Sequence, residues 1–127
     1  MRIGLDLTDL DRIQKAVEQP RFSERIFSPE EQELFASRAG RRKIETMAGN
    51  FCAKEAFVKA LGCGFDRGIT PDQIGVLRDP AGAPFLKLTG KAAQEARGWS
   101  ISVSITHTET TAAAVVLMEE TAPLRKL

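Results

Sequence analysis

The chain has 127 residues, a length typical of one domain with its own hydrophobic core. Its residues are 43% hydrophobic and 28% charged, and its net charge of +1 excludes a globally basic nucleic-acid binder but not a local basic patch. The two cysteines, Cys52 and Cys63, are too few for a four-ligand zinc site or a disulfide framework, and no apolar run approaches the ~18 residues of a membrane span. We expect a cytoplasmic protein with reduced thiols and no membrane partner.

The first predicted element is a strand that begins at Ile3. Ile3, Leu5 and Leu7 alternate with polar or small residues, which is the period of a half-buried strand. We expect these three side chains to face the core and Asp6 to point away from it. Thr8 is the predicted cap of the helix that follows.

Two helices are predicted after this strand. The first ends at Pro20 and buries a stripe made of Leu10, Ile13 and Val17. The second begins at Ser28, because a capping serine is followed by Pro29 at the first helical position and by a glutamate at the third. This second helix is expected to run to about Ser37.

A long apolar helix is predicted next. A basic loop over residues 39–43 is expected to precede it, and the helix begins near Glu45 and stops at Gly62, where a C-terminal glycine cap belongs. Residues 62–68 then form a glycine-rich loop. This loop lacks the spacing of Walker and Rossmann motifs, so a flexible connector and a phosphate-binding loop both stay open.

The second half of the chain is predicted to be rich in strands. Short strands at 76–77 and 85–88 flank a turn at 79–82, and the alternating segment 100–106 pairs with the apolar segment 112–118. Thr89 is the predicted cap of an intervening helix that ends at Gly98. Helices followed by strands predict an α+β fold, formed by residues 1–118 as a single domain with a frayed tail over 119–127.

Glu55 and Lys59 are the charged residues that stand out in the long helix. They lie at i and i+4 on one face among apolar side chains, where a charge costs several kcal/mol in lost hydration unless it is compensated. Their mutual ion pair is one compensation, and a metal ion with a phosphate is another. Lys54 lies on a different side of the helix. There it is equally expected to contact phosphate or to be solvated.

Asp6 and Glu55 are candidate metal ligands. Mg²⁺ takes one or two carboxylates and completes its coordination with water and substrate phosphates, so two acids from distant parts of the chain suit it. From the residues alone, acids at such positions are more often capping or ion-paired residues than metal ligands.

Three segments resemble the holo-acyl-carrier-protein synthases, the short 4′-phosphopantetheinyl transferases. Residues 51–64 resemble the family signature "FAAKEAxxKAxGxG", residues 4–13 its opening "GxDxxxxxRI", and residues 103–108 its closing "VSI(S/T)HT". The three occur in the family's order and at roughly its spacing. The resemblance covers nearly the whole chain up to Met118.

The resemblance implies a fold and a reaction. The fold is the 4′-phosphopantetheinyl transferase fold, with helices packed on a small, mostly antiparallel sheet. The reaction transfers 4′-phosphopantetheine from coenzyme A to a serine of apo-acyl carrier protein, requires Mg²⁺, and releases adenosine 3′,5′-bisphosphate. The short form of this family is typically a homotrimer with its sites between subunits.

The resemblance also assigns roles to individual residues. Asp6 and Glu55 would bind Mg²⁺, and the catalytic pair would be Glu55 and Lys59, with Lys59 neutralising charge on the reacting phosphate. Contacts to coenzyme A are implied for Lys59, Gly62, Gly64, His107 and Thr108.

A basic cluster near the end of the first helix is the predicted partner-binding surface. Arginines at matching family positions dock the acidic carrier protein, although a charge run is more often only a solvated face. The cluster comprises Arg12, Arg21, Phe22 and Arg25. Nucleic acid is the competing partner, and it is disfavoured by the near-neutral charge and by seven Phe, one Trp and no Tyr for stacking on bases.

The sequence departs from the family pattern at three positions. Asn50 stands where an arginine is common, Cys52 replaces a usual alanine, and Ala83 replaces a usual lysine. The missing arginine puts one phosphate contact in doubt, or leaves it to the basic residues 41–43. Two other function classes stay open, a divalent-metal nuclease and a non-catalytic adaptor for an acidic protein.

Overall fold

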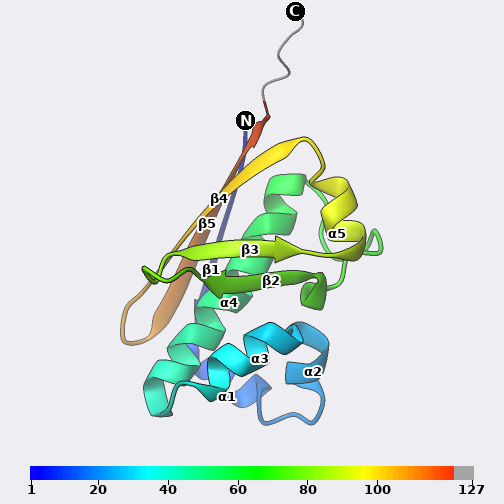
Figure 1. Ribbon diagram of the computed structural model, residues 1–127. Helices are drawn as coiled ribbons and strands as arrows, with labels where there is room; N and C mark the ends of the chain where they lie inside the picture. The colour runs from blue at the N-terminus through cyan, green and yellow to red at the C-terminus, as the bar shows by residue number, and fades with distance from the viewer. Residues whose placement is uncertain (122–127) are drawn as a thin grey trace, which may run out of the picture.

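A long helix, α4 (Gly40–Leu61), forms the centre of the molecule in the computed structural model, which describes residues 1–121. One side of α4 packs along a three-stranded sheet, and a two-stranded sheet contacts another side (Figure 1). The shorter helices α1 to α3 gather near the start of α4 (Figure 1). This is the α+β, single-domain arrangement predicted from the sequence.

The larger sheet is antiparallel throughout and has the strand order β1-β5-β4. Its strands are β1 (Arg2–Asp9), β4 (Trp99–His107) and β5 (Thr111–Glu120). Asp6 on β1 lies opposite Ala114 on β5, which in turn lies opposite Ile105 on β4. β1 and β4 are therefore the two edges of this sheet, a point that matters for the site.

The smaller elements follow the sequence pattern in part. The first helix and the helix after Thr89 end at Ala16 and Glu95, earlier than the predicted ends at Pro20 and Gly98, and the short helix at Phe22–Ile26 was not predicted. The predicted hairpin is confirmed as β2 (Ile74–Arg78) paired with β3 (Pro84–Leu88). The remaining helices are α1 (Leu10–Ala16), α2 (Phe22–Ile26), α3 (Pro29–Ala36), the 3₁₀ turn η1 (Pro71–Gln73) and α5 (Gly90–Glu95).

The predicted capping box at the start of α3 is present. The Glu31 backbone N–H donates to Ser28 Oγ at 3.3 Å, and the Ser28 N–H donates to Glu31 Oε1 at 2.9 Å. These two bonds satisfy amide groups that the first turn of a helix leaves without intrahelical partners. Local chemistry alone therefore determines where this helix begins.

The orientation of β1 is the reverse of the one predicted. Ile3, Leu5 and Leu7 are 66%, 60% and 65% exposed, whereas Gly4 is buried against α4. A Cβ on Gly4 would lie 1.9 Å from the Ala56 carbonyl oxygen, so only glycine lets the strand approach the helix this closely. The sheet thus turns its aliphatic residues outward and brings Asp6 to the helix side.

The predicted starts of two helices were also wrong. Thr8 does not cap α1, because β1 continues to Asp9 and the Thr8 hydroxyl is buried without a hydrogen-bond partner among residues 1–121. The predicted basic loop at 39–43 is instead the first turn of α4, which begins at Gly40. Arginine and lysine are good helix formers, so the run extends the helix N-terminally.

The C-terminal strand is longer than predicted. β5 continues to Glu120, and the Thr121 N–H donates to the Gly98 carbonyl at 2.9 Å. Residues 119 and 120 therefore belong to the sheet and not to a tail. The rest of the predicted tail, residues 122–127, lies outside the described residues.

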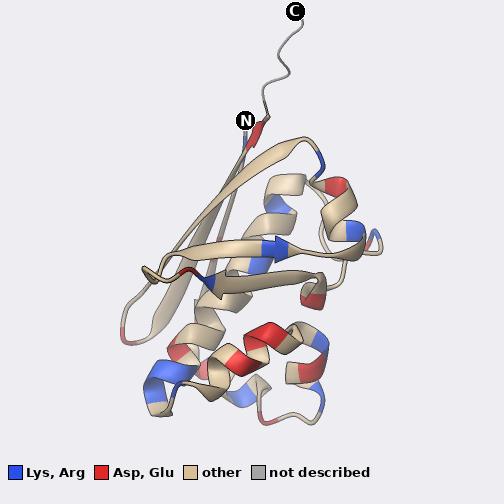
Figure 2. Ribbon diagram, in the orientation of Figure 1, with Lys and Arg blue, Asp and Glu red and all other residues tan. Residues whose placement is uncertain are grey.

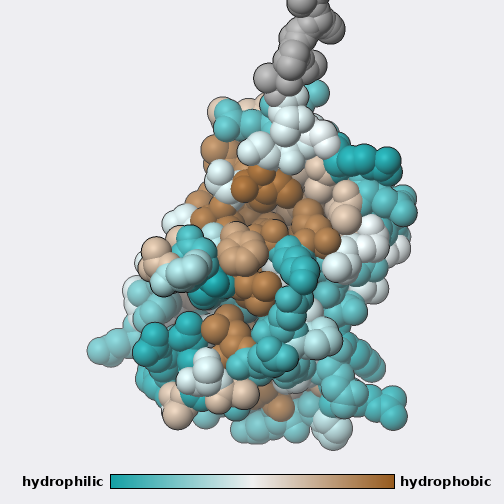
Figure 3. Space-filling model, in the orientation of Figure 1, coloured by the Kyte–Doolittle hydropathy of each residue, from teal (hydrophilic) through white to brown (hydrophobic). Residues whose placement is uncertain are grey.

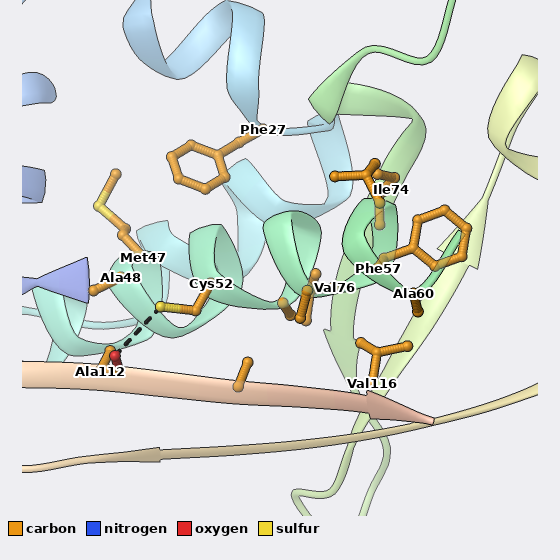
Figure 4. Packing of buried hydrophobic residues seen from close by; sticks show 14 of the residues in the cluster. Phe27, Met47, Ala48, Cys52, Phe57, Ala60, Ile74, Val76, Ala112 and Val116 are labelled. Atoms are coloured by element: carbon orange, nitrogen blue, oxygen red, sulfur yellow. Dashed lines mark hydrogen bonds between the residues drawn. The ribbon is translucent and has the colours of Figure 1, made fainter. Parts of the chain in front are cut away.

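The hydrophobic core lies between α4 and the two sheets (Figure 4). Three elements contribute fully buried side chains that meet there, namely Phe57 from α4, Ile74 and Val76 from β2, and Val116 from β5. Cys52 donates its thiol to the Ala112 carbonyl at 3.4 Å, which ties α4 to β5 (Figure 4). On the outer surface seen in Figure 3, apolar side chains gather in the middle of the face, over the smaller sheet.

Candidate functional site

Asp6 and Glu55 form an acidic site between β1 and α4. Asp6 is only 15% exposed, because its strand turns it toward the helix that carries Glu55. Partial burial, and then the negative charge of Asp6, raise the pKa of Glu55 above its ordinary value. Two carboxylates that repel each other at a partly buried position are a suitable place for a cation.

Lys59 belongs to this acidic site, but its partner is not the one that spacing suggests. Its ammonium donates to Asp6 Oδ1 at 3.1 Å and to the Leu5 carbonyl at 3.0 Å. Among residues 1–121, no ion pair joins Lys59 to Glu55 one turn earlier. The side chain remains 54% exposed, so it can also reach a ligand at the surface.

The acidic site fits a hard divalent cation that keeps open coordination positions. Over residues 1–121, no three His, Cys, Asp or Glu side chains gather as a complete protein cage. Two carboxylates are what Mg²⁺ uses when phosphate and water supply its remaining ligands. The donor set therefore fits Mg²⁺ with a phosphorylated substrate and does not fit a structural zinc ion.

Lys54 is a core residue, and both sequence interpretations of it were wrong. It is 1% exposed, and its ammonium lies 2.7 Å from Oε1 of the fully buried Glu31. It also donates to the carbonyls of Pro71 and Ile74 at 2.9 and 2.6 Å. A buried ammonium is tolerated only with such complete pairing, so Lys54 ties α4 to α3 and β2.

A second candidate site is a basic pocket at the other edge of the large sheet. It is a hollow of about 400 Å³ beside the start of α4. Its wall includes Arg38, Arg42, Arg78, His107 and Glu45. The first turn of α4 stands out as positively charged in Figure 2.

The arginines of the basic pocket are not neutralised by carboxylates. Among residues 1–121, none of Arg38, Arg42 and Arg78 makes an ion pair, and Arg38 Nε is buried without a hydrogen-bond partner. Burial, and then the charge of Arg38, lower the pKa of Arg78. Unpaired cations that repel one another across a hollow favour an anionic ligand.

His107 lines this pocket at the end of β4, and Thr108 follows it in the turn toward β5. His107 is 45% exposed, and its Nδ1 lies 3.8 Å from Glu45 Oε2. Thr108 Oγ1 accepts the N–H groups of Thr110 and Thr111 at 3.2 and 3.1 Å, and so closes the turn. His107 is therefore accessible to a ligand, whereas the hydroxyl of Thr108 already accepts two hydrogen bonds within the turn.

Gly62 and Gly64 lie at the far end of α4, one turn beyond Lys59. Gly62 adopts the left-handed conformation at φ +81°, and its N–H bonds to the carbonyls of Val58 and Lys59, as in a C-terminal cap. Gly64 has φ +131°, which side chains rarely adopt. Their backbone places them near Lys59, and their proposed contact with coenzyme A stays a prediction.

The acidic site and the basic pocket lie at opposite edges of the large sheet. Asp6 is on the edge strand β1, and His107 is on the opposite edge strand β4. Glu45 and Glu55 are ten residues apart on α4, or about 15 Å along its axis. One chain therefore does not bring the two sites together.

The predicted partner-binding residues adjoin the acidic site. The Arg12 guanidinium lies 5.8 Å from the centre of the Phe51 ring. Burial raises the pKa of Glu55, and the positive charge of Arg12 offsets part of this increase. The Phe22 ring lies 6.5 Å from Phe51. This places the surface around Arg12 and Phe22 directly beside the candidate metal ligands.

Arg21 and Arg25 continue this surface over α2. Arg21 takes the left-handed conformation at φ +80°, the only residue other than glycine to do so among residues 1–121. A hollow of about 340 Å³ beside Pro20 is lined by Phe22, Arg25 and Ile26. An apolar hollow flanked by exposed arginines is suited to an acidic protein with a small apolar contact.

Sequence analysis did not find Arg38 and Arg78 as site residues. Arg38 lies between α3 and α4, whereas Arg78 is the last residue of β2, and no short motif contains both. Only the packing of the β2-β3 hairpin near α4 brings them to one pocket. No sequence signal would have identified them.

The family model for the 4′-phosphopantetheinyl transferase superfamily matches residues 2–116. The chain belongs to this superfamily, and this makes it a transferase by class. The predicted family, fold and enzyme class are thereby confirmed.

Within that superfamily, the chain is similar to holo-(acyl-carrier-protein) synthases. A holo-(acyl-carrier-protein) synthase of Listeria innocua is 43% identical over 119 residues, which cover 93% of this chain and 97% of that protein. The corresponding synthase of Maridesulfovibrio salexigens is 42% identical over 123 residues, with 93% and 97% covered. A crystal structure of the Bacillus anthracis synthase in complex with coenzyme A (3′,5′-ADP) is 32% identical, has a TM-score of 0.83, and covers 94% of this chain and 96% of its own.

Proposed function

We propose that this protein is a holo-acyl-carrier-protein synthase, which transfers 4′-phosphopantetheine from coenzyme A to a serine of apo-acyl carrier protein. The observation that carries the proposal is the acidic site, where Asp6, Glu55 and Lys59 converge from two elements beside an arginine-rich surface. The released product would be adenosine 3′,5′-bisphosphate. The similarity to the synthases of Listeria innocua and Maridesulfovibrio salexigens supports this particular member of the superfamily.

Asp6 and Glu55 would hold Mg²⁺, which when bound neutralises charge on the pyrophosphate and on the leaving phosphate. Phosphoryl transfer depends mainly on positioning and on such neutralisation. Lys59 adds a positive charge next to Asp6, and its exposure lets it turn to a phosphate oxygen. Two groups are candidates to accept the serine proton, namely Glu55 itself and a water associated with the metal.

The basic pocket would bind another part of coenzyme A. Coenzyme A carries a phosphate monoester on its ribose in addition to the reacting pyrophosphate. The unpaired Arg38, Arg42 and Arg78 suit this dianion, and His107 can donate a hydrogen bond at the mouth of the pocket. Gly62, Gly64 and Thr108 stay candidates for further backbone or hydroxyl contacts.

We further propose that the active form is a homotrimer with its sites between subunits. A single chain keeps the acidic site and the basic pocket on opposite sheet edges, whereas a neighbour can place its β4 edge beside β1. Such a contact joins two different surfaces, and a rotation that closes gives a ring. The outward Ile3, Leu5 and Leu7 provide an apolar face for that assembly.

The carrier protein would dock on Arg12, Arg21, Phe22 and Arg25. This surface adjoins Glu55, so a docked carrier would present its serine at the acidic site. Acidic carriers are attracted over a distance by such arginines, which act mainly on the rate of encounter. Among residues 1–121 no helix is long and apolar enough to cross a membrane, and a cytoplasmic location stays a prediction.

Intact mass spectrometry of an apo-carrier tests the function directly. Protein, coenzyme A, Mg²⁺ and apo-carrier should yield a carrier heavier by about 340 Da, the phosphopantetheine increment of this phosphoryl transfer. Asp6→Asn and Glu55→Gln should each lower turnover by about 10²-fold. An unmodified carrier, with cleavage of added DNA or RNA, would indicate a nuclease instead. Carrier binding that survives loss of both acids, without transfer, would indicate an adaptor.

Mixing two inactive variants tests the shared site. Asp6→Asn disables one sheet edge and His107→Ala the other, so a one-to-one mixture should form roughly a quarter of intact sites if subunits exchange and each site spans two subunits. Either variant alone should remain weak. A mixture no more active than the average of its components would place each site within one subunit.

A further inference from the structure

Asn50, which stands where the family commonly has an arginine, is the centre of a buried hydrogen-bond network. It is 0% exposed, and its Nδ2 donates both to Glu31 Oε2 and to the Val76 carbonyl, each at 2.9 Å. Its Oδ1 accepts from Arg78 Nη2 at 3.0 Å. The two acceptors on one side fix the amide orientation, so the oxygen must face Arg78.

Arg78 is held by this network at the wall of the basic pocket. Its second anchor is the Leu77 carbonyl, which accepts from Nη1 at 3.3 Å. Two of the five guanidinium N–H donors are used in these contacts, and the other three have no hydrogen-bond partner among residues 1–121. The side chain approaches the pocket from β2, whereas a residue at position 50 approaches from α4.

An uncharged residue at position 50 is what this arrangement requires. An amide can donate to Glu31 and accept from Arg78 at once, whereas an arginine has no acceptor to offer Arg78. The pocket already contains the like charges of Arg38 and Arg42. Asn50 carries no guanidinium, and Arg78 on the β2-β3 hairpin therefore provides one in its place.

We propose that Asn50 is a positioning residue that aims the Arg78 guanidinium at a phosphate monoester in the basic pocket, namely the ribose 3′-phosphate of coenzyme A. This inference rests on the proposed function for the identity of the ligand. The reacting pyrophosphate belongs at the acidic site, which leaves the monoester as the phosphate for this pocket. A monoester carries close to two negative charges at neutral pH and accepts bidentate bonds from arginine.

Calorimetric binding of two nucleotides tests the proposal without catalysis. The probes are adenosine 3′,5′-bisphosphate and adenosine 5′-monophosphate, which differ in the 3′-phosphate. Arg78→Ala should weaken binding of the bisphosphate about tenfold or more, the loss expected for a hydrogen bond to a charged group, and should leave the monophosphate unchanged. Arg78→Lys should retain part of the preference. Arg97→Ala, an exposed arginine after α5, controls for loss of one positive charge.

A double variant tests the positioning role of Asn50. Asn50→Leu should weaken bisphosphate binding less than Arg78→Ala does, and the two changes together should cost no more than Arg78→Ala alone. With coenzyme A as substrate, the same variants should raise KM and leave kcat nearly constant. Additive losses would refute positioning, because a purely structural Asn50 would act independently of the ligand contact.

Two outcomes would overturn the inference and remain separate from the function itself. Equal weakening of both nucleotides by Arg78→Ala, or none, would show that Arg78 does not contact the 3′-phosphate even if the wild-type protein modifies its carrier. Failure of the proposed function would appear instead as an unmodified carrier in the wild-type mass assay. If Asn50→Leu does not fold, the comparison of Arg78→Ala with Arg78→Lys still decides the contact.

Discussion

Two lysines of the same helix should respond in opposite ways to substitution by methionine. Methionine keeps most of the aliphatic length and removes the charge. Lys54 is 1% exposed and paired with the fully buried Glu31, whereas Lys59 is 54% exposed and paired with Asp6. Lys54→Met should therefore lower stability, and Lys59→Met should lower activity.

The magnitude for Lys54 follows from what its removal leaves behind. Loss of one partner of a buried ion pair costs about 3–5 kcal/mol, because the remaining charge is uncompensated. Glu31 would keep its bonds from the Ser28 N–H and from Asn50, which favours the lower half of this range. For a chain of 127 residues this corresponds to a decrease in Tm of about 10–20 °C.

Thermal melts beside carrier modification separate the two roles. Lys59→Met should lose less than about 1 kcal/mol of stability, because its ion pair is largely exposed, while turnover falls by about 10²-fold. Lys54→Met should retain substantial turnover per folded molecule below its Tm. A Lys54→Met protein that melts like wild type and is inactive would refute the buried pair and make Lys54 a phosphate contact.

Three further predictions concern the surfaces and the thiols. Leu5→Glu should convert the proposed trimer into monomers in sedimentation experiments and abolish transfer while the melt stays cooperative, because Leu5 lies on the outward face of β1. An unchanged sedimentation coefficient would remove this face from the proposed interface. Reversal of Arg21 and Arg25 to Glu should raise KM for the carrier and flatten its dependence on salt, with KM for coenzyme A little changed; equal effects on both substrates would assign these arginines to the fold. Burial raises the pKa of Cys52 to about 12, with a further contribution from Asp6. A thiol reagent should therefore modify only the partly exposed Cys63 in the folded protein at pH 7 to 9, and both cysteines in denaturant; rapid modification of two thiols in the folded protein would contradict the buried position of Cys52.

Much of the local structure is determined by the sequence itself. The capping box at Ser28 and Glu31, the glycine cap at Gly62 and the alternation of β4 depend on neighbouring residues, and they are recognisable without tertiary information. The acidic site was predictable for a different reason, since Asp6, Glu55 and Lys59 lie within motifs that resemble a family. Its ion pair between Lys59 and Asp6 was not predictable, because helical spacing favours Glu55 as the partner.

Tertiary packing decided the rest. Alternation along β1 indicates that its two faces differ but not which face is buried, and the close approach of α4 at Gly4 reverses the simple expectation. The same applies to Lys54, whose burial depends on Glu31 in another helix. The basic pocket exists only because the hairpin brings Arg78 beside Arg38, two residues whose separation along the chain carries no signal of contact. Periodicity describes one element at a time, whereas burial and charge pairing depend on which elements meet.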